Sequence, residues 1–273
     1  MHFPNPPTAS TVASAQRLLK LIENLNIPYG YEQSLRIRQR ILLTNRFLLS
    51  ISKTSLQDNA HRRILDLCSS LAMPDEFLAL SKQHLDLTRF VHFGFEENHS
   101  KCLYKVYLEL DHIENPNNRD RILRHLSFKW NPCQQSEQVI TKYYYYPALS
   151  VQDIHHKLIH IYNDNTHSEA LAISNIILEI AAQHSGDNGL NYLEVIEENN
   201  PRISYDINIY PAKLRVRNIQ KLLIRMFRYY AITENLFLPI YTQIRDKFLG
   251  HIAGGIHRDG QDFFNIYYGI ESR

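Results

Sequence analysis

Hydrophobic side chains in the first third of the chain recur with the period of an α-helix. Residues 11–25 place four apolar side chains on one helical face. The 3.6-residue period continues over residues 31–52, and shorter helical patterns follow at 57–72 and 75–86. The apolar positions that set the period in the first two segments are Ala15, Leu18, Leu19, Ile22, Leu35, Ile41, Leu42 and Leu48. We therefore expect residues 11–87 to be helical.

From residue 88 onward the pattern changes to alternation with a period of two, which is typical of strands. Four hairpins are predicted, with strands at 90–97 and 102–110, 124–131 and 137–146, 190–197 and 202–210, and 249–257 and 262–269. Helical patterns lie between them at 151–163, 167–185, 214–231 and 234–247. The dipeptide Asp259-Gly260 is a strong tight-turn signal in the last hairpin.

This order of elements predicts an α+β fold. Hairpins require antiparallel pairing, so folds built on a parallel sheet are disfavoured. Helix pairs between hairpins can cover only one face of a sheet. The other face must meet water, another layer, or itself across a closed barrel. No linker-like segment divides the chain, so we expect one domain over residues 1–273, with a loose arm at 1–10 and hairpin–helix repeats over 88–270.

The two faces of the predicted strands differ in chemistry. One face is apolar and suits packing beneath helices. The other repeats a polar residue, a spacer and a tyrosine, as in Lys105-x-Tyr107, Lys142-x-Tyr144, Asn208-x-Tyr210 and Asn265-x-Tyr267. An open sheet with one face in solvent is the simplest explanation of such alternation. However, the chain has 17 tyrosines, and a ring with a polar tip suits the wall of a half-wet cavity.

Composition and charge exclude several classes of protein. The formal net charge is only +2 and no basic stripe is present, so a nucleic-acid partner is not expected. No apolar run is long enough for a membrane span, and no signal peptide is recognisable. Cys68, Cys102 and Cys133 have no metal-binding spacing and fit a reducing compartment, so we expect a soluble, cytoplasmic protein.

Known catalytic and metal-binding motifs are missing from the sequence. Residues 250–260 are glycine-rich but lack the ending of a phosphate loop, so the glycines are expected to permit a bend or a close backbone approach. His251 and His257 would lie about 20 Å apart along a strand and could not share a metal. There is no aspartate-rich magnesium motif and no serine-nucleophile motif.

The hairpins and their polar-x-Tyr pairs resemble those of the αββα-barrel aromatic prenyltransferases, of the fungal indole and cyanobactin types. The resemblance covers residues 88–270. It implies a barrel of antiparallel hairpins surrounded by helices, with the active site in the lumen. Members of that family usually have five hairpins, whereas four are recognisable here.

The resemblance also implies a reaction, in which a prenyl group moves from an allylic diphosphate to an indole, a phenol, or a peptide Tyr or Trp. The allylic diphosphate would be a co-substrate, and neither a cofactor nor magnesium is indicated. Diphosphate binding is assigned to Lys105, Lys129 and Lys142, and shielding of the allylic cation to Tyr107, Tyr144, Tyr210 and Tyr267. Glu96 is the first choice of base, with Glu109, Glu194 and Asp206 as rivals. The remaining polar residues assigned to the lumen are Asn208, His251, His257 and Asn265.

Two alternatives remain at this point. One is a non-catalytic α+β module whose tyrosine-rich sheet face binds a ligand or another protein. The other is an enzyme that uses glutamate and histidine acid–base chemistry in the same cavity.

Overall fold

The computed structural model describes residues 9–98, 101–111, 121–147, 149–162, 165–185, 189–200 and 203–273. Residues 1–8 of the predicted arm lie outside these ranges, as do the predicted turn residues His99, Ser100 and Pro201.

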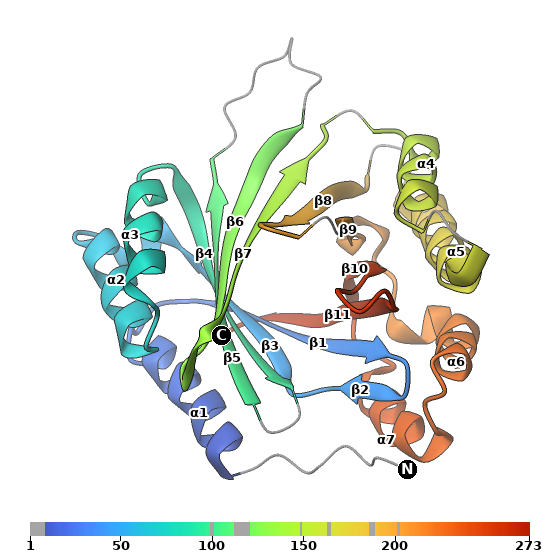
Figure 1. Cartoon of the computed structure of the whole chain (residues 1–273), viewed down its shortest axis with the longest axis horizontal. Coiled ribbons are helices and arrows are strands. Elements are labelled where there is room, and N and C mark those ends of the chain that lie inside the picture. The colour runs from blue at the N-terminus through green and yellow to red at the C-terminus, as the bar shows by residue number, and fades with distance from the viewer. Residues whose placement is uncertain are drawn as a thin grey trace.

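The described strands form a single antiparallel sheet that closes on itself (Figure 1). Ten strands make the ring, in the order β1-β3-β4-β5-β6-β7-β8-β9-β10-β11, and the short β2 pairs with the end of β1 beside β3. Their bounds are β1 Gly30–Arg38, β2 Ile41–Leu43, β3 Arg46–Ser52, β4 Thr88–Asn98, β5 Lys101–Leu110, β6 Ile122–Asn131, β7 Gln134–Tyr145, β8 Asn191–Glu197, β9 Ile203–Asn208, β10 Leu249–Ile256 and β11 Asp262–Ser272.

Pairing between β1 and β11 closes the barrel. The register runs from Gly30 opposite Ser272 to Ile37 opposite Phe264. The open-sheet interpretation is therefore wrong, and the predicted αββα-type barrel is confirmed. Strand β11 of the last predicted hairpin pairs with β1. Strands β1 and β3 pair with each other and form the fifth hairpin.

The helix predicted over residues 31–52 is wrong, because this segment forms β1, β2 and β3. Its apolar residues fit a helical period and also a period of two. In β1, Leu35 and Ile37 are buried outside the barrel, whereas Glu32, Ser34 and Arg36 alternate with them. Pairing with β11 and β4 decides between the two patterns, and neither partner is adjacent in sequence.

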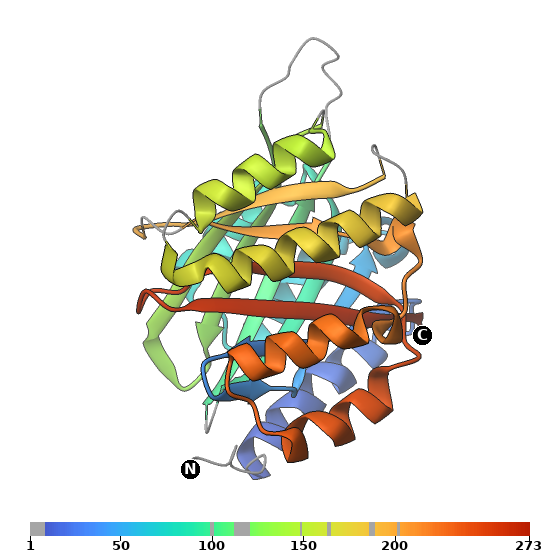
Figure 2. The same ribbon diagram turned by 90° about the vertical axis from the view of Figure 1, so that its right-hand side faces the viewer.

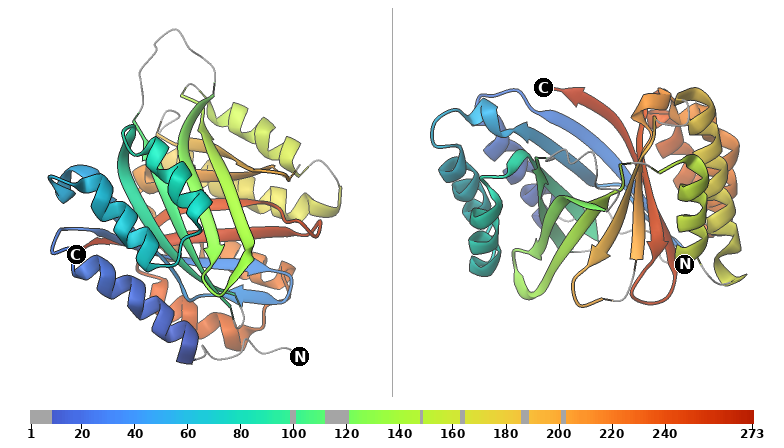
Figure 3. Two further views of the ribbon diagram at one scale, coloured as in Figure 1. Left: turned by 60° about the vertical axis from the view of Figure 1, so that its left-hand side comes forward. Right: turned by 90° about the horizontal axis from the view of Figure 1, so that it is seen from above.

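Helices cover the outside of the barrel in two groups. In Figure 1, α1, α2 and α3 lie along one side and α4–α7 along the opposite side, and Figure 2 shows the second group crossing the strands. The view from above in Figure 3 separates both groups from the strands. Their bounds are α1 Ala9–Glu23, α2 Ala60–Ser70, α3 Asp75–His84, α4 Val151–Ile161, α5 Ser168–Ser185, α6 Gln220–Tyr229 and α7 Glu234–Ile244. No helix in the described ranges is both long and apolar enough to cross a membrane.

The hydrophobic core lies between the barrel and the helices, in two parts. Outward residues of β3–β6, such as Phe93 and Val106, pack under α1–α3 and are fully buried. Outward residues of β8–β11, such as Ile207 and Ile252, pack under α4–α7. Each such side chain contributes about 1.5–3 kcal/mol through burial. Because the core is outside the ring, the inner face of the strands is free to carry polar chemistry.

Candidate functional site

The lumen contains two cavities of about 640 and 560 Å³. Both are lined by inward-facing residues of the barrel strands. Four residues line both cavities and so mark the boundary between them: Tyr107, Tyr143, Asp206 and Tyr267. We call the larger cavity the basic half and the smaller one the acidic half, from the side chains described below.

A buried ion cluster lies at the basic half. Glu96 on β4 forms ion pairs with Arg46 on β3, at 2.6 Å, and with Lys129 on β6, at 3.0 Å. Lys105 on β5 donates a third charged hydrogen bond to the same carboxylate. Neighbouring strands bring these four residues together, because Arg46 is opposite Glu96 and Lys105 is opposite Lys129 in the register. One carboxylate among three cations leaves a surplus of positive charge.

The cluster has unusual proton affinities. Burial opposes ionisation of Glu96, but the surrounding Arg46, Lys105 and Lys129 hold its pKa well below the ordinary value. Burial lowers the pKa of Lys105 to about 7, and the nearby cations Lys129 and Arg46 act in the same direction, against Glu96. Burial also lowers the pKa of Lys129. Glu96 is therefore ionised and is the counter-ion of the two lysines.

Further cations line the basic half. The guanidinium of Arg36 on β1 lies 4.3 Å from the centre of the Phe263 ring. Lys101 and Arg258 stand at the rim, where they pair with Glu137 and Glu197. His257 also lines this half, and burial together with Arg38 and Arg36 lowers its pKa to about 4. At neutral pH this histidine is thus uncharged.

Three tyrosines form a belt across the middle of the lumen. Tyr107 and Tyr143 meet edge to face, with ring centroids 5.6 Å apart, and Tyr267 lines the same boundary. Burial raises the pKa of all three phenols, so each is neutral. The ammonium of Lys105 lies 6.0 Å from the centre of the Tyr107 ring. The belt therefore offers aromatic faces directly beside the basic half.

The acidic half contains a buried glutamate held by a tyrosine. Tyr210 donates a hydrogen bond to Oε1 of Glu32 on β1. Burial raises the pKa of Glu32, and His251 and Tyr210 act in the opposite direction. A side chain at Gly250 would displace the carboxylate of Glu32 and the phenol of Tyr210, so glycine here permits their close approach to β10. A buried carboxylate whose pKa is raised is a suitable proton acceptor.

Next to Glu32, a protonated histidine forms an ion pair with an aspartate. His251 Nδ1 is 2.7 Å from Asp206 Oδ1. Burial opposes the charge on His251, but Asp206 raises its pKa to about 9, so His251 is protonated at neutral pH. His251 also contacts the rings of Tyr210 and Tyr267 edge to face. The ion pair therefore holds the His251 ring and the Asp206 carboxylate beside the tyrosine belt.

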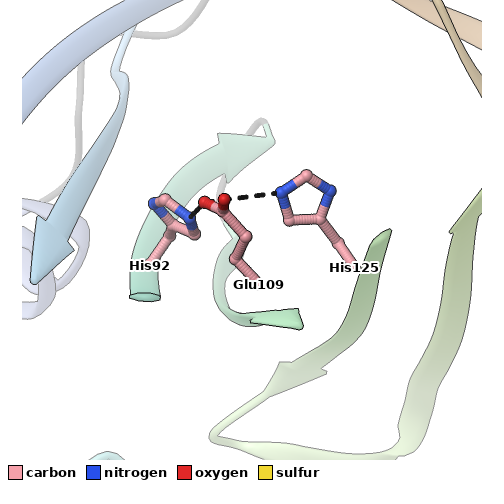
Figure 4. Close-up of side chains that lie close together, drawn as sticks. All are labelled: His92, Glu109 and His125. Atoms are coloured by element: carbon pink, nitrogen blue, oxygen red, sulfur yellow. Dashed lines mark hydrogen bonds and ion pairs between the residues drawn. The ribbon is translucent and has the colours of Figure 1, made fainter. Parts of the chain in front are cut away.

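On the opposite wall, Glu109 lies between two histidines (Figure 4). Its Oε2 is 3.2 Å from His92 Nε2 and 3.8 Å from His125 Nε2. Its other oxygen accepts a hydrogen bond from Arg124 at 2.7 Å. Burial opposes the charge on Glu109, but the hydrogen bonds from His125 and His92 lower its pKa. The carboxylate is therefore ionised and already partnered.

Known proteins resemble this chain in structure. The prenyltransferase PriB, in a binary complex with product diphosphate, matches with a TM-score of 0.64 and 12% identity over 96% of this chain and 91% of its own. The 6-dimethylallyltryptophan synthase from Micromonospora olivasterospora, solved with DMASPP and Trp, has a TM-score of 0.58 and 13% identity over 97% and 98%. The 5-dimethylallyltryptophan synthase from Streptomyces coelicolor also scores 0.58, at 13% identity over 96% and 92%.

The chain has the αββα-barrel fold. No protein-family model matches its sequence, and no curated protein matches it either. The likeness therefore lies in the barrel rather than in the amino-acid sequence.

The αββα barrel brings most of the sequence-predicted residues into the lumen. Lys105 and Lys129 line the basic half, and Glu96 is bonded to both. Glu109 and Tyr210 line the acidic half, and Tyr107 and Tyr267 lie in the belt. The other predicted polar residues of the lumen also line it: Asp206, Asn208, His251, His257 and Asn265.

Three predicted residues lie on the outer face of the barrel, which corrects their expected orientation. Lys142 pairs with Glu198 at 2.8 Å, and Tyr144 lies under the guanidinium of Arg121. Glu194 pairs with Arg121 and with Lys157 on α4. The cause on β7 is a run of four tyrosines, 143–146, which gives both faces the same pattern. On β8 the apolar side chains of Leu193 and Val195 line the cavities and the polar Glu194 faces outward. This is the reverse of the other strands, whose polar side chains face the lumen.

Sequence reasoning assigned no role to several residues of the αββα lumen. Glu32, Arg36 and Arg46 lie in the segment that was expected to be helical, and Tyr143 lies on the opposite face of β7 from the one assigned. The alternation from Tyr31 to Arg38 was the signal that could have identified Glu32 and Arg36, because its even positions are polar.

Proposed function

We propose that this protein is an aromatic prenyltransferase, which transfers a prenyl group from an allylic diphosphate to an aromatic acceptor. One observation carries the proposal. Within the fold of the dimethylallyltryptophan synthases, a belt of tyrosines divides the lumen into a half rich in cations and a half rich in acids and histidines. Ionisation of an allylic diphosphate produces an anion and a carbocation, and the two halves and the belt suit these charges.

The diphosphate is proposed to bind in the basic half. Lys105, Lys129 and Arg46 are held on Glu96, and Arg36 faces the same cavity. A diphosphate carries more negative charge than one carboxylate, so it can draw the two lysines into charge-assisted hydrogen bonds. Glu96 then keeps the cations close together when no donor is bound. In this proposal Glu96 is a counter-ion rather than the base.

The prenyl chain is proposed to cross the tyrosine belt. When the C–O bond breaks, its electron pair leaves with the diphosphate and the allyl group becomes a cation. The faces of Tyr107, Tyr143 and Tyr267 attract that charge by about 0.5–2 kcal/mol per contact. Their neutral phenols are poor nucleophiles, and their rings keep water from the cation.

The aromatic acceptor is proposed to bind in the acidic half. The walls of the acidic half include the apolar side chains of Leu48, Leu193 and Ile270, which can pack against an aromatic ring. The cavity of about 560 Å³ is large enough for an indole or a phenol. Ring carbon attacks the cation to form the new C–C bond, and the resulting arenium ion must lose a proton. Glu32 is our candidate base, since burial raises its pKa and Tyr210 orients it.

A product assay tests the proposal. The protein is incubated with dimethylallyl diphosphate and tryptophan, indole or tyrosine, and the acceptors are analysed by mass spectrometry. We expect at least one acceptor to gain one dimethylallyl group and an equal amount of diphosphate to be released. Donor binding without any acceptor-dependent release of diphosphate would contradict transfer and favour a binding protein.

A further inference from the structure

His92, Glu109 and His125 form a cluster of three potential metal ligands on the wall of the acidic half. The three residues come from adjacent strands β4, β5 and β6, and their side chains converge from the cavity wall (Figure 4). One donor atom from each lies within 4.8 Å of the others. Two of the three separations, 3.2 and 3.8 Å, bracket the spacing of about 3.4 Å between ligands on a tetrahedral ion with bonds of about 2.1 Å.

We propose that His92, Glu109 and His125 bind a divalent transition-metal ion, with Zn²⁺ as the best match. Two imidazole nitrogens and one carboxylate oxygen are the protein ligands of many catalytic zinc sites. Imidazole ligands suit zinc and its neighbours, whereas magnesium prefers a shell of oxygens. The site is therefore expected to bind Zn²⁺ or Co²⁺ and to reject Mg²⁺.

Two neighbouring side chains already orient the ligands. Ser50 Oγ is 2.8 Å from Nδ1 of His92, which leaves Nε2 facing Glu109. Arg124 holds Oε1 of Glu109, which leaves Oε2 for a single bond to the metal. Partners of this kind fix the ring and the carboxylate in the direction that ligation needs. Arg124 and the protonated His251 also line this cavity and repel a cation, whereas the acids Glu32 and Asp206 attract one.

The remaining coordination positions would face the acidic half. All three ligands line that cavity, and their side chains are only 16–19% exposed. A three-ligand site with an open side takes water or a donor atom of a bound molecule as its fourth ligand. In this protein the molecule would be one that carries a carboxylate, a hydroxyl or an amine beside its ring. The metal is thus separated from the cations that we assign to diphosphate.

This inference is independent of prenyl transfer, and metal binding can be measured without any substrate. Protein treated with a chelator is titrated with Co²⁺ and, separately, with Zn²⁺ and Mg²⁺. We expect one tight Co²⁺ site with the visible absorption of a four- or five-coordinate ion, displacement of Co²⁺ by Zn²⁺, and no displacement by Mg²⁺.

Variants identify the ligands. His92→Ala and His125→Ala should each weaken binding of Zn²⁺ by about 100-fold or more, and Ser50→Ala by about 10-fold through the orientation of His92. His155→Ala is the matched control, because His155 lies on α4 outside the barrel and bonds to Asn175. It should leave Zn²⁺ affinity unchanged. If a histidine variant does not fold, Ser50→Ala still tests the site.

The proposal is overturned if the chelator-treated protein binds Zn²⁺ no more tightly than His92→Ala does, or if bound Co²⁺ shows only the weak absorption of a six-coordinate aqua ion. Either result would mean that the cluster is a hydrogen-bonded wall of the cavity and nothing more.

Discussion

The charge on Lys105 depends on pH near neutrality, because burial lowers the pKa of this side chain to about 7. The lysine is protonated below that value and neutral above it. Donor binding needs the protonated form, so affinity for a diphosphate should be greatest below pH 7 and fall as the pH rises through it. We expect a loss of up to about tenfold per pH unit above the pKa. Calorimetric titration with a non-reactive dimethylallyl diphosphate analogue measures this slope.

Lys105→Arg is the control for that slope, since arginine stays charged at every pH in the titration. It should flatten the dependence while the ionisation of the ligand itself is unchanged. If the wild-type protein and Lys105→Arg lose affinity in parallel, Lys105 is not the group that titrates.

Glu32 provides the second prediction at the residue level. Glu32→Gln keeps the size of the side chain and an oxygen for the hydrogen bond from Tyr210, but removes the base. We expect kcat for prenyl transfer to fall by about 10²- to 10⁴-fold, with donor affinity nearly unchanged. Steady-state kinetics and donor titration separate the two effects. Glu194→Gln, on the outer face, should leave both at wild-type values. An equal loss in both variants would disprove the role of Glu32.

At the level of the secondary-structure element, strand β7 points two adjacent tyrosines to opposite faces of the barrel wall. Tyr143 lies in the belt and Tyr144 lies outside under Arg121. Tyr143→Ala should open the belt to water, so that more of the ionised donor is captured as prenyl alcohol and less as prenylated acceptor. The loss of one contact of about 0.5–2 kcal/mol corresponds to a change of roughly 2- to 30-fold in that ratio. Chromatography of the two products measures it. Tyr144→Ala should leave the ratio at the wild-type value, and an effect of Tyr144→Ala without one of Tyr143→Ala would show that β7 has the opposite face inward.

The sequence predicted the elements well wherever one face of the element contrasted with the other. The faces of β5, β9 and β11 were assigned correctly because Val106, Ile207 and Ile266 alternate with polar residues. Residues 143–146 at the end of β7 are all tyrosine, so its two faces have no contrast in polarity. In β8 the contrast is reversed, because Glu194 lies outside the barrel, where Arg121 and Lys157 neutralise its charge. In β1–β3 the spacing of the apolar residues also fitted a helix, and that pattern was preferred to the alternation from Tyr31 to Arg38. The glycine-rich segment of β10 was correctly expected to allow close approach, as Gly250 shows.

For the whole molecule, the N-terminal strands complete both the barrel and the site. Strand β1 pairs with β11, more than two hundred residues away in the chain, and β3 pairs with β4. The same strands supply Glu32 and Arg36 from β1 and Arg46 from β3. Pairing over such a separation has no sequence signature in a single chain, because it depends on which strand edges remain free after the local hairpins form. The polar lumen could therefore be predicted, whereas closure of the barrel through β1 and β11 could not.

Donor binding is the direct test of whether the basic half of the closed barrel binds a diphosphate. A non-reactive dimethylallyl diphosphate analogue is titrated calorimetrically into the wild-type protein, the double variant Lys105→Ala/Lys129→Ala, and Lys142→Ala. Each charged hydrogen bond is worth about 1.5–3 kcal/mol, so the double variant should bind at least about 100-fold more weakly. Lys142→Ala, on the outer face, should bind like the wild type. Equal affinities for all three proteins, or no binding to the wild type, would contradict the assignment of the basic half to the diphosphate.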